Sequence, residues 1–167
     1  MPEKIELRCI DSPFGQYAFA SIGSKICAAE FVDDDVTFIA RIKKKMSDML
    51  VEQKDVVENI CGITLQSLVV QYAQYDKFIL EGTDFQISVW KALLRIPLGK
   101  CVSYSYVAAM INRPCAVRAV ASAIAKNPIA VLVPCHRVIK SSGDIGEYRW
   151  GRARKKAILD WEKCVTK

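Results

Sequence analysis

The length, composition and charge of the chain exclude several classes of protein. At 167 residues it can form one sizeable domain or two small ones. Its 51% hydrophobic and 25% charged residues are ordinary for a globular protein and exclude a disordered chain. No apolar run approaches the roughly 20 residues of a membrane span, and the charged N-terminus lacks a signal-peptide core. We therefore expect a protein that stays inside the cell.

The charge of the chain is concentrated in its second half, within a formal net charge of +6. Residues 1–83 contain 9 Lys and Arg against 13 Asp and Glu, whereas residues 84–167 contain 15 against 5. A basic half favours an anionic partner such as nucleic acid. Basic residues also solvate ordinary surfaces, so the charge alone leaves the partner open.

The cysteine pattern argues against metal chemistry. The chain has 7 scattered cysteines with no C-x-x-C pair, and His136 is its only histidine. This excludes a zinc-finger pattern, so we expect neither a metal nor a cofactor. In a reducing compartment most of these cysteines are expected to be small core residues.

The first half of the chain predicts a small sheet with a helix. Alternating apolar residues and a turn at Gly23-Ser24 predict strands over residues 5–9, 17–22 and 25–31. The acidic run at residues 33–35 then supplies N-cap candidates for a helix. This helix is expected to bury one apolar face, made of Val36, Ile39, Met46, Met49 and Leu50. Residues 51–80 are too weakly periodic to assign.

The second half predicts a succession of helices. Thr83 and Gln86 match a capping box. The helix that follows is expected to end at Pro97-Leu98-Gly99 and to bury Phe85, Val89, Trp90, Ala92, Leu93 and Ile96. Two short helices come next, over residues 103–111 and 115–125, joined by a tight turn around Pro114. Two helices and a short turn in a basic domain predict a helix-turn-helix.

The second of these two helices is a poor reader of base sequence. It offers mostly alanine, and Arg118 and Lys126 are its only charged residues. Base edges in the major groove are usually read by Gln, Asn and Arg, which disfavours a sequence-specific transcription regulator. Part of the alanine face is expected to be core packing. The rest is expected to be a smooth face that lies on DNA, with Arg118 projecting into the groove or the base stack.

A cysteine beside a histidine follows these helices. The apolar run over residues 129–133 predicts a buried strand or an extended segment, which Pro134 ends. Cys135 and His136 then form a candidate activated nucleophile, and equally a buried structural cysteine beside a chance histidine. A glycine-bearing loop over residues 141–151 and a final helix with a basic start complete the chain.

These motifs together resemble the O6-alkylguanine-DNA alkyltransferases, also called methylated-DNA–protein-cysteine methyltransferases. The resemblance covers residues 82–162, about half of the chain. It rests on motifs that occur in order, namely Gly82-Thr83-Asp84-Phe85-Gln86, Ile96-Pro97-Leu98-Gly99, Ser103-Tyr104, Arg118-Ala119-Val120, Asn127-Pro128, Pro134-Cys135-His136-Arg137-Val138 and the loop from Gly143 to Gly151. It implies an α/β (α+β) fold, with an RNase H-like N-terminal domain over residues 1–80 and a helix-turn-helix, alkyl-acceptor domain over residues 81–167.

The resemblance implies direct reversal of alkylation damage. The nucleotide is flipped out of duplex DNA through the minor groove, and its alkyl group passes irreversibly from O6-alkylguanine, less often O4-alkylthymine, to Cys135. The thioether product resists water, so each chain acts once. We expect a cytoplasmic monomer, nuclear in a eukaryote, with double-stranded DNA as partner and no membrane. The alternative is a non-catalytic protein that flags lesions, but such proteins replace the acceptor cysteine.

The resemblance also assigns residues to roles. His136 would take the thiol proton through a water, because adjacent residues of an extended segment point apart, and Glu162 would orient it. The catalytic set is Cys135, His136, Glu162, Tyr104 and Asn127. The DNA-binding set is Arg118, Tyr104, Ser105, Arg113, Ala119, Ser122, Lys126 and Ser141. The base pocket would be built from Val133, Val138, Ile145, Gly146, Tyr148 and Arg149. The chain departs from the family pattern at Ala121, Ala130 and Trp150.

Overall fold

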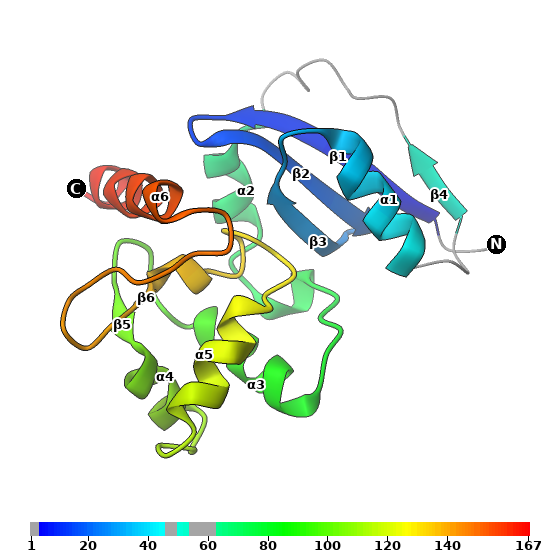
Figure 1. The fold of residues 1–167 in the computed structure, drawn as a ribbon. Coiled ribbons are helices and arrows are strands. Elements are labelled where there is room, and N and C mark those ends of the chain that lie inside the picture. The colour runs from blue at the N-terminus through cyan, green and yellow to red at the C-terminus, as the bar shows by residue number, and fades with distance from the viewer. Residues whose placement is uncertain (1–3, 46–49, 54–62) are drawn as a thin grey trace. The chain divides into compact units, whose positions relative to one another are not determined.

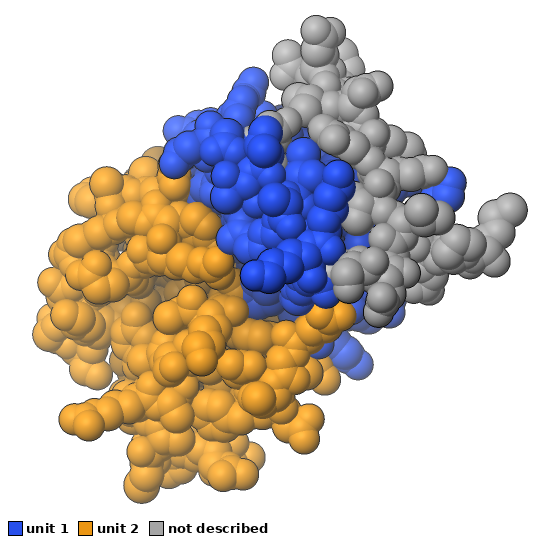
Figure 2. Space-filling model, turned by 45° about the vertical axis from the view of Figure 1, so that its right-hand side comes forward, with its two compact units in different colours: residues 1–80, 128–132 blue, residues 81–127, 133–167 orange. Residues whose placement is uncertain are grey.

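The computed structural model describes residues 4–45, 50–53 and 63–167. The chain divides into two compact units, residues 1–80 with 128–132 and residues 81–127 with 133–167, which are coloured separately in Figure 2. The short segment Pro128–Leu132 thus belongs to the first unit, although the chain on both sides of it belongs to the second. Over the described ranges, no helix is both long enough and apolar enough to cross a membrane.

A four-stranded sheet forms the centre of the first unit (Figure 1). Its strands are β1 (Lys4–Ser12), β2 (Gly15–Ile22), β3 (Lys25–Phe31) and β4 (Leu50–Gln53), in the order β3-β2-β1-β4. The first three strands are antiparallel neighbours, and β4 runs parallel to β1. The three predicted strands and the turn between β2 and β3 are confirmed, and Gly23 takes the positive φ of +58° that favours glycine in a tight turn.

Helix α1 (Asp35–Lys45) covers one face of this sheet (Figure 1). The Asp34 carboxylate caps it by accepting a hydrogen bond from the Thr37 amide at 2.8 Å. The buried core under the helix consists of Phe38 and Ile42 from α1 and of Ile5, Leu7, Ala18, Ala20, Cys27 and Ala28 from the strands.

The predicted face of this helix is wrong at Val36, whose side chain is 70% exposed. Val36 lies two positions before Phe38 and therefore about 200° around the helix from the buried side. Ile39, at the margin of that side, is partly buried against the core. Leu50 belongs to β4 rather than to the helix. Met46 and Met49 lie outside the described residues.

Residues 51–80, which sequence patterns left unassigned, contain most of β4 and, in their described part, two short helices. Helix α2 (Leu65–Gln71) begins with a reciprocal capping box between Thr64 and Ser67 and buries Leu65 and Leu68. A 3₁₀ helix (Tyr75–Lys77) follows. With only seven residues, α2 is too short for a helical hydrophobic period to stand out in the sequence.

The second unit begins with α3 (Asp84–Leu93), whose predicted capping box is confirmed. Thr83 Oγ1 accepts from the Gln86 amide at 3.2 Å, and Gln86 Oε1 accepts from the Thr83 amide at 3.0 Å. The helix ends at Leu93, earlier than the predicted stop at Pro97, and Ile96 is buried beyond its end. Trp90 is a core residue, as expected, and its indole donates to the Ala123 carbonyl at 2.9 Å.

Two further helices, α4 (Tyr104–Met110) and α5 (Val117–Ala125), pack against each other and against α3. The Ser103 hydroxyl caps α4 by accepting from the Tyr106 amide at 3.1 Å. The turn between the helices includes Asn112 at a φ of +57°. Helix α5 starts two residues later than predicted, because Cys115 and Ala116 belong to the turn, and it ends before Asn127-Pro128 as predicted.

A short parallel pair and the last helix complete the second unit. Strand β5 (Val102–Ser103) pairs with β6 (Val138–Ile139), so that the chain entering α4 lies beside the chain that leaves Cys135. Helix α6 (Arg152–Val165) buries one face, made of Lys155, Ile158, Leu159 and Glu162. The β5–β6 pair and helix α6 therefore bring the start of α4, the chain after Cys135 and the C-terminal helix together in the second unit.

Candidate active site

The chain approaches Cys135 through two tight turns. Residues 129–133 are buried as predicted, and Ile129 forms a parallel bridge with Ala29. The predicted strand or extended segment is wrong beyond Ala130, because Leu132 donates its amide to the Ala130 carbonyl at 2.7 Å, with Val131 at a φ of +66°. Pro134, at φ −82° and ψ 63°, then forms an inverse γ-turn in which the Cys135 amide donates to the Val133 carbonyl at 2.8 Å. Continuous apolar character predicts burial here, and burial does not require a strand.

Cys135 begins a 3₁₀ helix (Cys135–Arg137), so the premise that Cys135 and His136 sit on extended backbone is also wrong. Asn127 braces the segment, because its side-chain amide donates to the Val133 carbonyl at 2.9 Å. Cys135 is 5% exposed and His136 is fully buried. The thiol and the imidazole are therefore both held by a compact, hydrogen-bonded backbone.

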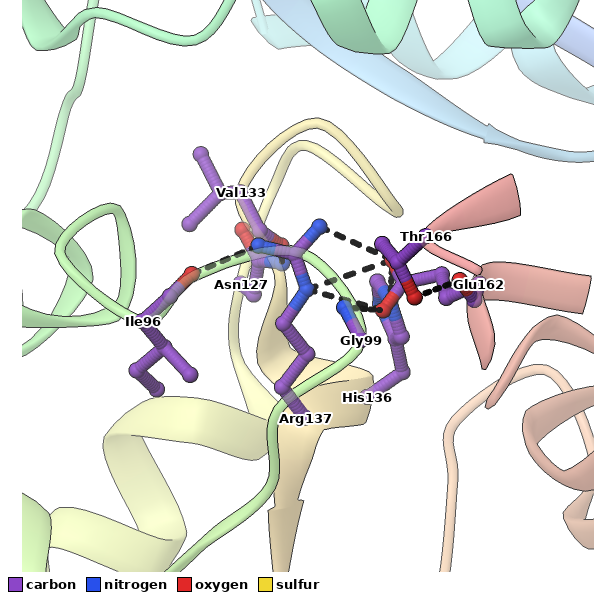
Figure 3. A network of polar contacts seen from close by, with 8 residues as sticks. All are labelled: Ile96, Gly99, Asn127, Val133, His136, Arg137, Glu162 and Thr166. Carbon is purple, nitrogen blue, oxygen red and sulfur yellow. Dashed lines mark hydrogen bonds and ion pairs between the residues drawn. The ribbon is translucent and has the colours of Figure 1, made fainter. Parts of the chain in front are cut away.

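A buried polar network lies around His136 (Figure 3). His136 Nε2 lies 2.7 Å from Glu162 Oε1. Arg137 donates to the same carboxylate from Nε, at 3.0 Å to Oε2, and from Nη2, at 2.8 Å to Oε1. The remaining nitrogen, Nη1, donates to the Ile96 carbonyl at 2.7 Å. The carboxylate of α6 thus holds two consecutive residues of the 3₁₀ helix in place.

The protonation states of this network follow from its geometry. Burial acts to raise the pKa of Glu162, but hydrogen bonds from His136 and Arg137 outweigh it and hold the pKa at about 2. Burial lowers the pKa of His136, against the opposing effect of Glu162, so the imidazole is neutral at pH 7. A neutral imidazole beside an ionised carboxylate carries its proton on Nε2. Nδ1, which is buried without a hydrogen-bond partner among the described residues, is then the basic nitrogen.

A pocket of ≈ 460 Å³ lies beside this network, within the range typical of small-ligand sites. Four residues that the sequence assigns to the site line it: Cys135, Tyr104, Tyr148 and Arg149. Burial, reinforced by the nearby Cys135, raises the pKa of the Tyr104 phenol, so this hydroxyl remains a hydrogen-bond donor at neutral pH.

Other assigned residues lie behind or beside the pocket. Asn127, Val133 and Val138 are buried, at no more than 1% exposure each. A Cβ on Gly146 would lie 3.6 Å from the Tyr104 hydroxyl, which places this glycine close to the pocket wall. Ile145 is half-buried and is not among the lining residues.

The loop before α6 is fixed by an ion pair. Asp144 Oδ1 accepts from Arg152 at 2.9 Å and from the Gly146 amide at 2.7 Å. The Arg152 contact is the main reason that the pKa of Asp144 falls to about 2. At the C-terminal end of this loop, the Arg149 guanidinium packs over the Trp150 ring, 5.1 Å from its centroid. The Trp150 ring in turn packs edge-on against Tyr148. Tyr148 and Trp150 of the pocket wall therefore come from one short stretch of chain, whereas Tyr104 comes from α4.

Lys155 is a charged lining residue that sequence reasoning missed, as it missed Glu147, Ile124 and Ala125. It is 1% exposed, and its ammonium donates to the Val138 carbonyl at 2.8 Å and to the Glu147 carbonyl at 3.3 Å. The basic start of α6 opposes the helix dipole, which indicates charges that are either solvated or in contact with a partner. Helical spacing was the available signal, because Lys155 lies on the same face as Ile158, Leu159 and Glu162.

Lys155 and burial act on Cys135 in opposite directions. Burial dominates and raises the pKa of the thiol, whereas Asn127 and the charge of Lys155 oppose the rise. Cys135 is consequently a thiol at neutral pH and needs a base before it can act as a nucleophile.

The residues assigned to DNA binding lie at the surface, apart from the half-buried Tyr104. The exposed members are Ser105, Arg113, Arg118, Ala119, Ser122, Lys126 and Ser141. On α5 the exposed stripe consists of Arg118, Ala119, Ser122 and Ala125, whereas Val120, Ala123 and Ile124 are buried. The helix therefore divides between core packing and a smooth outer face, as expected, and Ala121, Ile124 and Ala125 connect it to the pocket.

A buried thiol in the wall of a pocket, followed in sequence by a histidine paired with a buried carboxylate, defines a protein with a candidate nucleophilic cysteine beside helix α5. Residues 84–164 match the family model described as 6-O-methylguanine DNA methyltransferase, DNA binding domain. A methylated-DNA–protein-cysteine methyltransferase of Mycobacterium leprae is 36% identical over 95% of this chain and 93% of its own. The crystal structure of Mycobacterium tuberculosis OGT in complex with DNA matches with a TM-score of 0.72 and 34% identity, covering 95% of this chain and 93% of that one.

The chain therefore belongs to the methylated-DNA–protein-cysteine methyltransferase family. It is also 36% identical, over 89% of its length, to the bifunctional transcriptional activator/DNA repair enzyme Ada of Escherichia coli. It spans 43% of the length of that relative and 44% of the corresponding regulatory protein of Salmonella typhimurium.

The depressed pKa of Glu162 predicts a pH-dependent contribution to stability. A carboxyl group whose pKa falls from 4.5 to about 2 on folding stabilises the fold above about pH 4.5, and this contribution is lost as the pH falls towards 2. Glu162→Gln should lower the free energy of unfolding at pH 7 by about 3 kcal/mol and flatten its acid dependence. Urea denaturation between pH 2.5 and 7 measures both, with Asp160→Asn on the exposed side of α6 as control. Parallel pH profiles for Glu162→Gln and wild type would contradict the assignment.

The buried ammonium of Lys155 predicts an effect on thiol reactivity. Lys155→Met removes a positive charge that favours the Cys135 thiolate, so alkylation of Cys135 by iodoacetamide should shift to higher pH. Peptide mass spectrometry follows each cysteine separately. Lys156→Met, which removes an exposed lysine paired with Asp160, is the matched control and should leave the profile unchanged. An unshifted profile for Lys155→Met would show that this charge does not reach the thiol.

Proposed function

We propose that this chain repairs alkylated DNA by moving a methyl or larger alkyl group from O6-alkylguanine to Cys135. The observation that carries the proposal is the placement of the Cys135 thiol in the wall of the pocket, with a neutral histidine and an ionised glutamate behind it. Family membership supports the same reaction, because relatives that span nearly the whole chain carry the name of this activity.

The proposed reaction is a displacement at carbon. The Cys135 sulfur forms a bond to the alkyl carbon, and the bond from that carbon to guanine O6 breaks. His136 Nδ1 takes the thiol proton through a bridging water, and Glu162 stabilises the imidazolium that forms. The proton is then returned to the leaving guanine, so that guanine and an S-alkylcysteine are the products.

Tyr104 is proposed to assist the departure of the base. Its hydroxyl stays protonated at neutral pH and lies at the pocket, so it can donate a hydrogen bond to the flipped guanine. A donor aimed at a leaving group stabilises the charge that develops on it. The polar main chain of residues 133, 138 and 149 would hold the remaining edges of the base.

Helix α5 is proposed to lie on the DNA. Its exposed stripe of small side chains allows close approach to a groove, and the described part of the helix carries no acidic residue. Arg118 is exposed near the start of this stripe and would fill the space left by the flipped nucleotide. In this proposal α4 and α5 act as a helix-turn-helix and residues 81–167 as the alkyl-acceptor domain, with residues 1–80 as an accompanying α/β domain.

The proposed reaction uses each chain once. A thioether on Cys135 is stable in water at neutral pH, and the groups around it activate a thiol rather than cleave a carbon–sulfur bond. We propose that the protein works inside the cell, where reducing conditions keep the acceptor cysteine free. Cys135 is free in the structure.

Incubation with duplex DNA that contains O6-methylguanine tests the acceptor directly. One methyl group per chain, about 14 Da, is expected on Cys135 because this thiol alone is assigned a base, and intact and peptide mass spectrometry measure it. Cys135→Ala should gain nothing, although the exposed Cys101, Cys115 and Cys164 remain available. A methyl group on one of those three, or no mass gain in the wild-type chain, would overturn the proposal.

Arg118→Ala tests the proposed role of α5. Loss of the Arg118 side chain should slow transfer from duplex DNA by about tenfold or more. Without this side chain in the space left by the flipped nucleotide, nothing offsets the energy of unstacking that nucleotide from its neighbours. Transfer from the free base O6-methylguanine should change by less than about twofold, since no base pair has to open. Arg95→Ala, at an exposed arginine just after α3 that is not assigned to DNA binding, is the matched control and should change neither rate. Equal losses with both substrates would exclude this role of Arg118.

A further inference from the structure

The segment that leads to Cys135 is anchored to the sheet of the first unit. The Ala29 amide of β3 donates to the Pro128 carbonyl at 3.0 Å, and the Ala130 amide donates back to the Ala29 carbonyl at 2.7 Å. Ile129 thereby forms a parallel bridge with Ala29 at the edge of the sheet. Residues 128–130 act as a minimal edge strand, although they lie between α5 and the acceptor cysteine in sequence.

The chain turns sharply directly after this anchor. Val131, at a φ of +66°, is the central residue of a γ-turn closed by the hydrogen bond from the Leu132 amide to the Ala130 carbonyl. A β-branched side chain is strongly disfavoured at positive φ. Such a conformation persists only where its surroundings fix it in several ways, and it is most often found near functional sites.

Tyr17 provides the side-chain contact to this turn. It is fully buried as the third residue of β2, and its hydroxyl donates to the Ala130 carbonyl, the same oxygen that closes the γ-turn. The ring is fixed between Phe31, 5.3 Å away and edge-on, and Phe19, 6.5 Å away. The packing of the ring therefore fixes the position of the Tyr17 hydroxyl at the turn.

The segment between this turn and the thiol is short and has little conformational freedom. Only Val133 and Pro134 lie between Leu132 and Cys135, and the Val133 carbonyl accepts from both the Asn127 side chain and the Cys135 amide. Pro134 also has a restricted φ. A displacement of Ala130 should therefore also displace Cys135, because the few residues between them cannot adjust their backbone conformation to compensate.

We propose that Tyr17 is a positioning residue for the acceptor cysteine. Its hydroxyl holds the strained turn at Val131, and the turn fixes the direction from which the chain enters the site. The inference rests on the proposed function of Cys135 as the alkyl acceptor. It gives the first unit a defined part in the reaction, although none of the side chains described in that unit lines the pocket.

Tyr17→Phe is the test, because it removes only the hydroxyl. Single-turnover transfer from duplex O6-methylguanine should slow by about tenfold, the size expected when a reacting group is misplaced by a fraction of an ångström. The rate of Tyr17→Phe relative to wild type should be the same at every pH from 6 to 9. The substitution leaves the protonation of the thiol, His136 and Glu162 as it is in wild type. Affinity for DNA, measured by anisotropy in a Cys135→Ala background, should stay within about twofold, because α5 is unchanged.

The comparison is made well below the melting temperature, so that every variant is folded. Tyr72→Phe, which removes a hydroxyl from a partly buried ring of the same unit packed on Phe78, is the matched control and should react at the wild-type rate. A Tyr17→Phe chain that melts earlier but reacts at the wild-type rate would show that Tyr17 is only a core residue. A wild-type chain that transfers nothing would overturn the proposed function itself, which separates the two failures.

A second pair of variants tests the strained turn without changing Tyr17. Glycine tolerates positive φ and alanine does not, so Val131→Gly should be more stable than Val131→Ala, the reverse of the usual order. In the Val131→Gly background the turn is no longer strained, so adding Tyr17→Phe should cost less transfer rate than it does in wild type. Additive effects on the rate would mean that the hydroxyl does not act through this turn.

Discussion

The candidate site depends on one buried carboxylate. Glu162 is fully buried near the end of α6, and it accepts hydrogen bonds from both His136 and Arg137. Ion pairs of this kind carry a large desolvation penalty, and removal of one partner leaves the other charge buried. The same contact sets the tautomer of the imidazole, leaves Nδ1 as its base, and ties the last helix to the 3₁₀ helix of the acceptor. Stability and reactivity are therefore linked at a single side chain.

Helix α5 satisfies two demands with small side chains. Val120, Ala123 and Ile124 pack inside, and Trp90 donates to the Ala123 carbonyl. Apart from Arg118, the exposed stripe of the helix carries only small side chains, and three residues of the helix line the pocket. The alanine content that makes the helix a poor reader of base sequence is what allows it to lie close to both its own core and a flat partner.

Local patterns predicted much of the fold and only part of the site. Short-range sequence patterns were enough to predict the capping box at Thr83, the three antiparallel strands and the buried Trp90. Each of these features depends on residues that are close together in the sequence. The turn at Val131 could not be predicted, because a β-branched residue at positive φ is held there by Tyr17, 114 positions away in chain order from Val131. Helical spacing places Lys155 on the buried face of α6, but its charge favours a position at the surface, in solvent or against a partner.

The burial of Cys135 has a consequence for its lifetime before damage is encountered. The thiol is 5% exposed, and burial raises its pKa, so little thiolate is present in the resting protein. Cellular oxidants and soft electrophiles attack exposed thiolates first. Cys101, Cys115 and Cys164 are exposed and would meet such reagents sooner. For the single-use reaction proposed for this chain, burial therefore limits the loss of Cys135 to reagents that attack exposed thiolates.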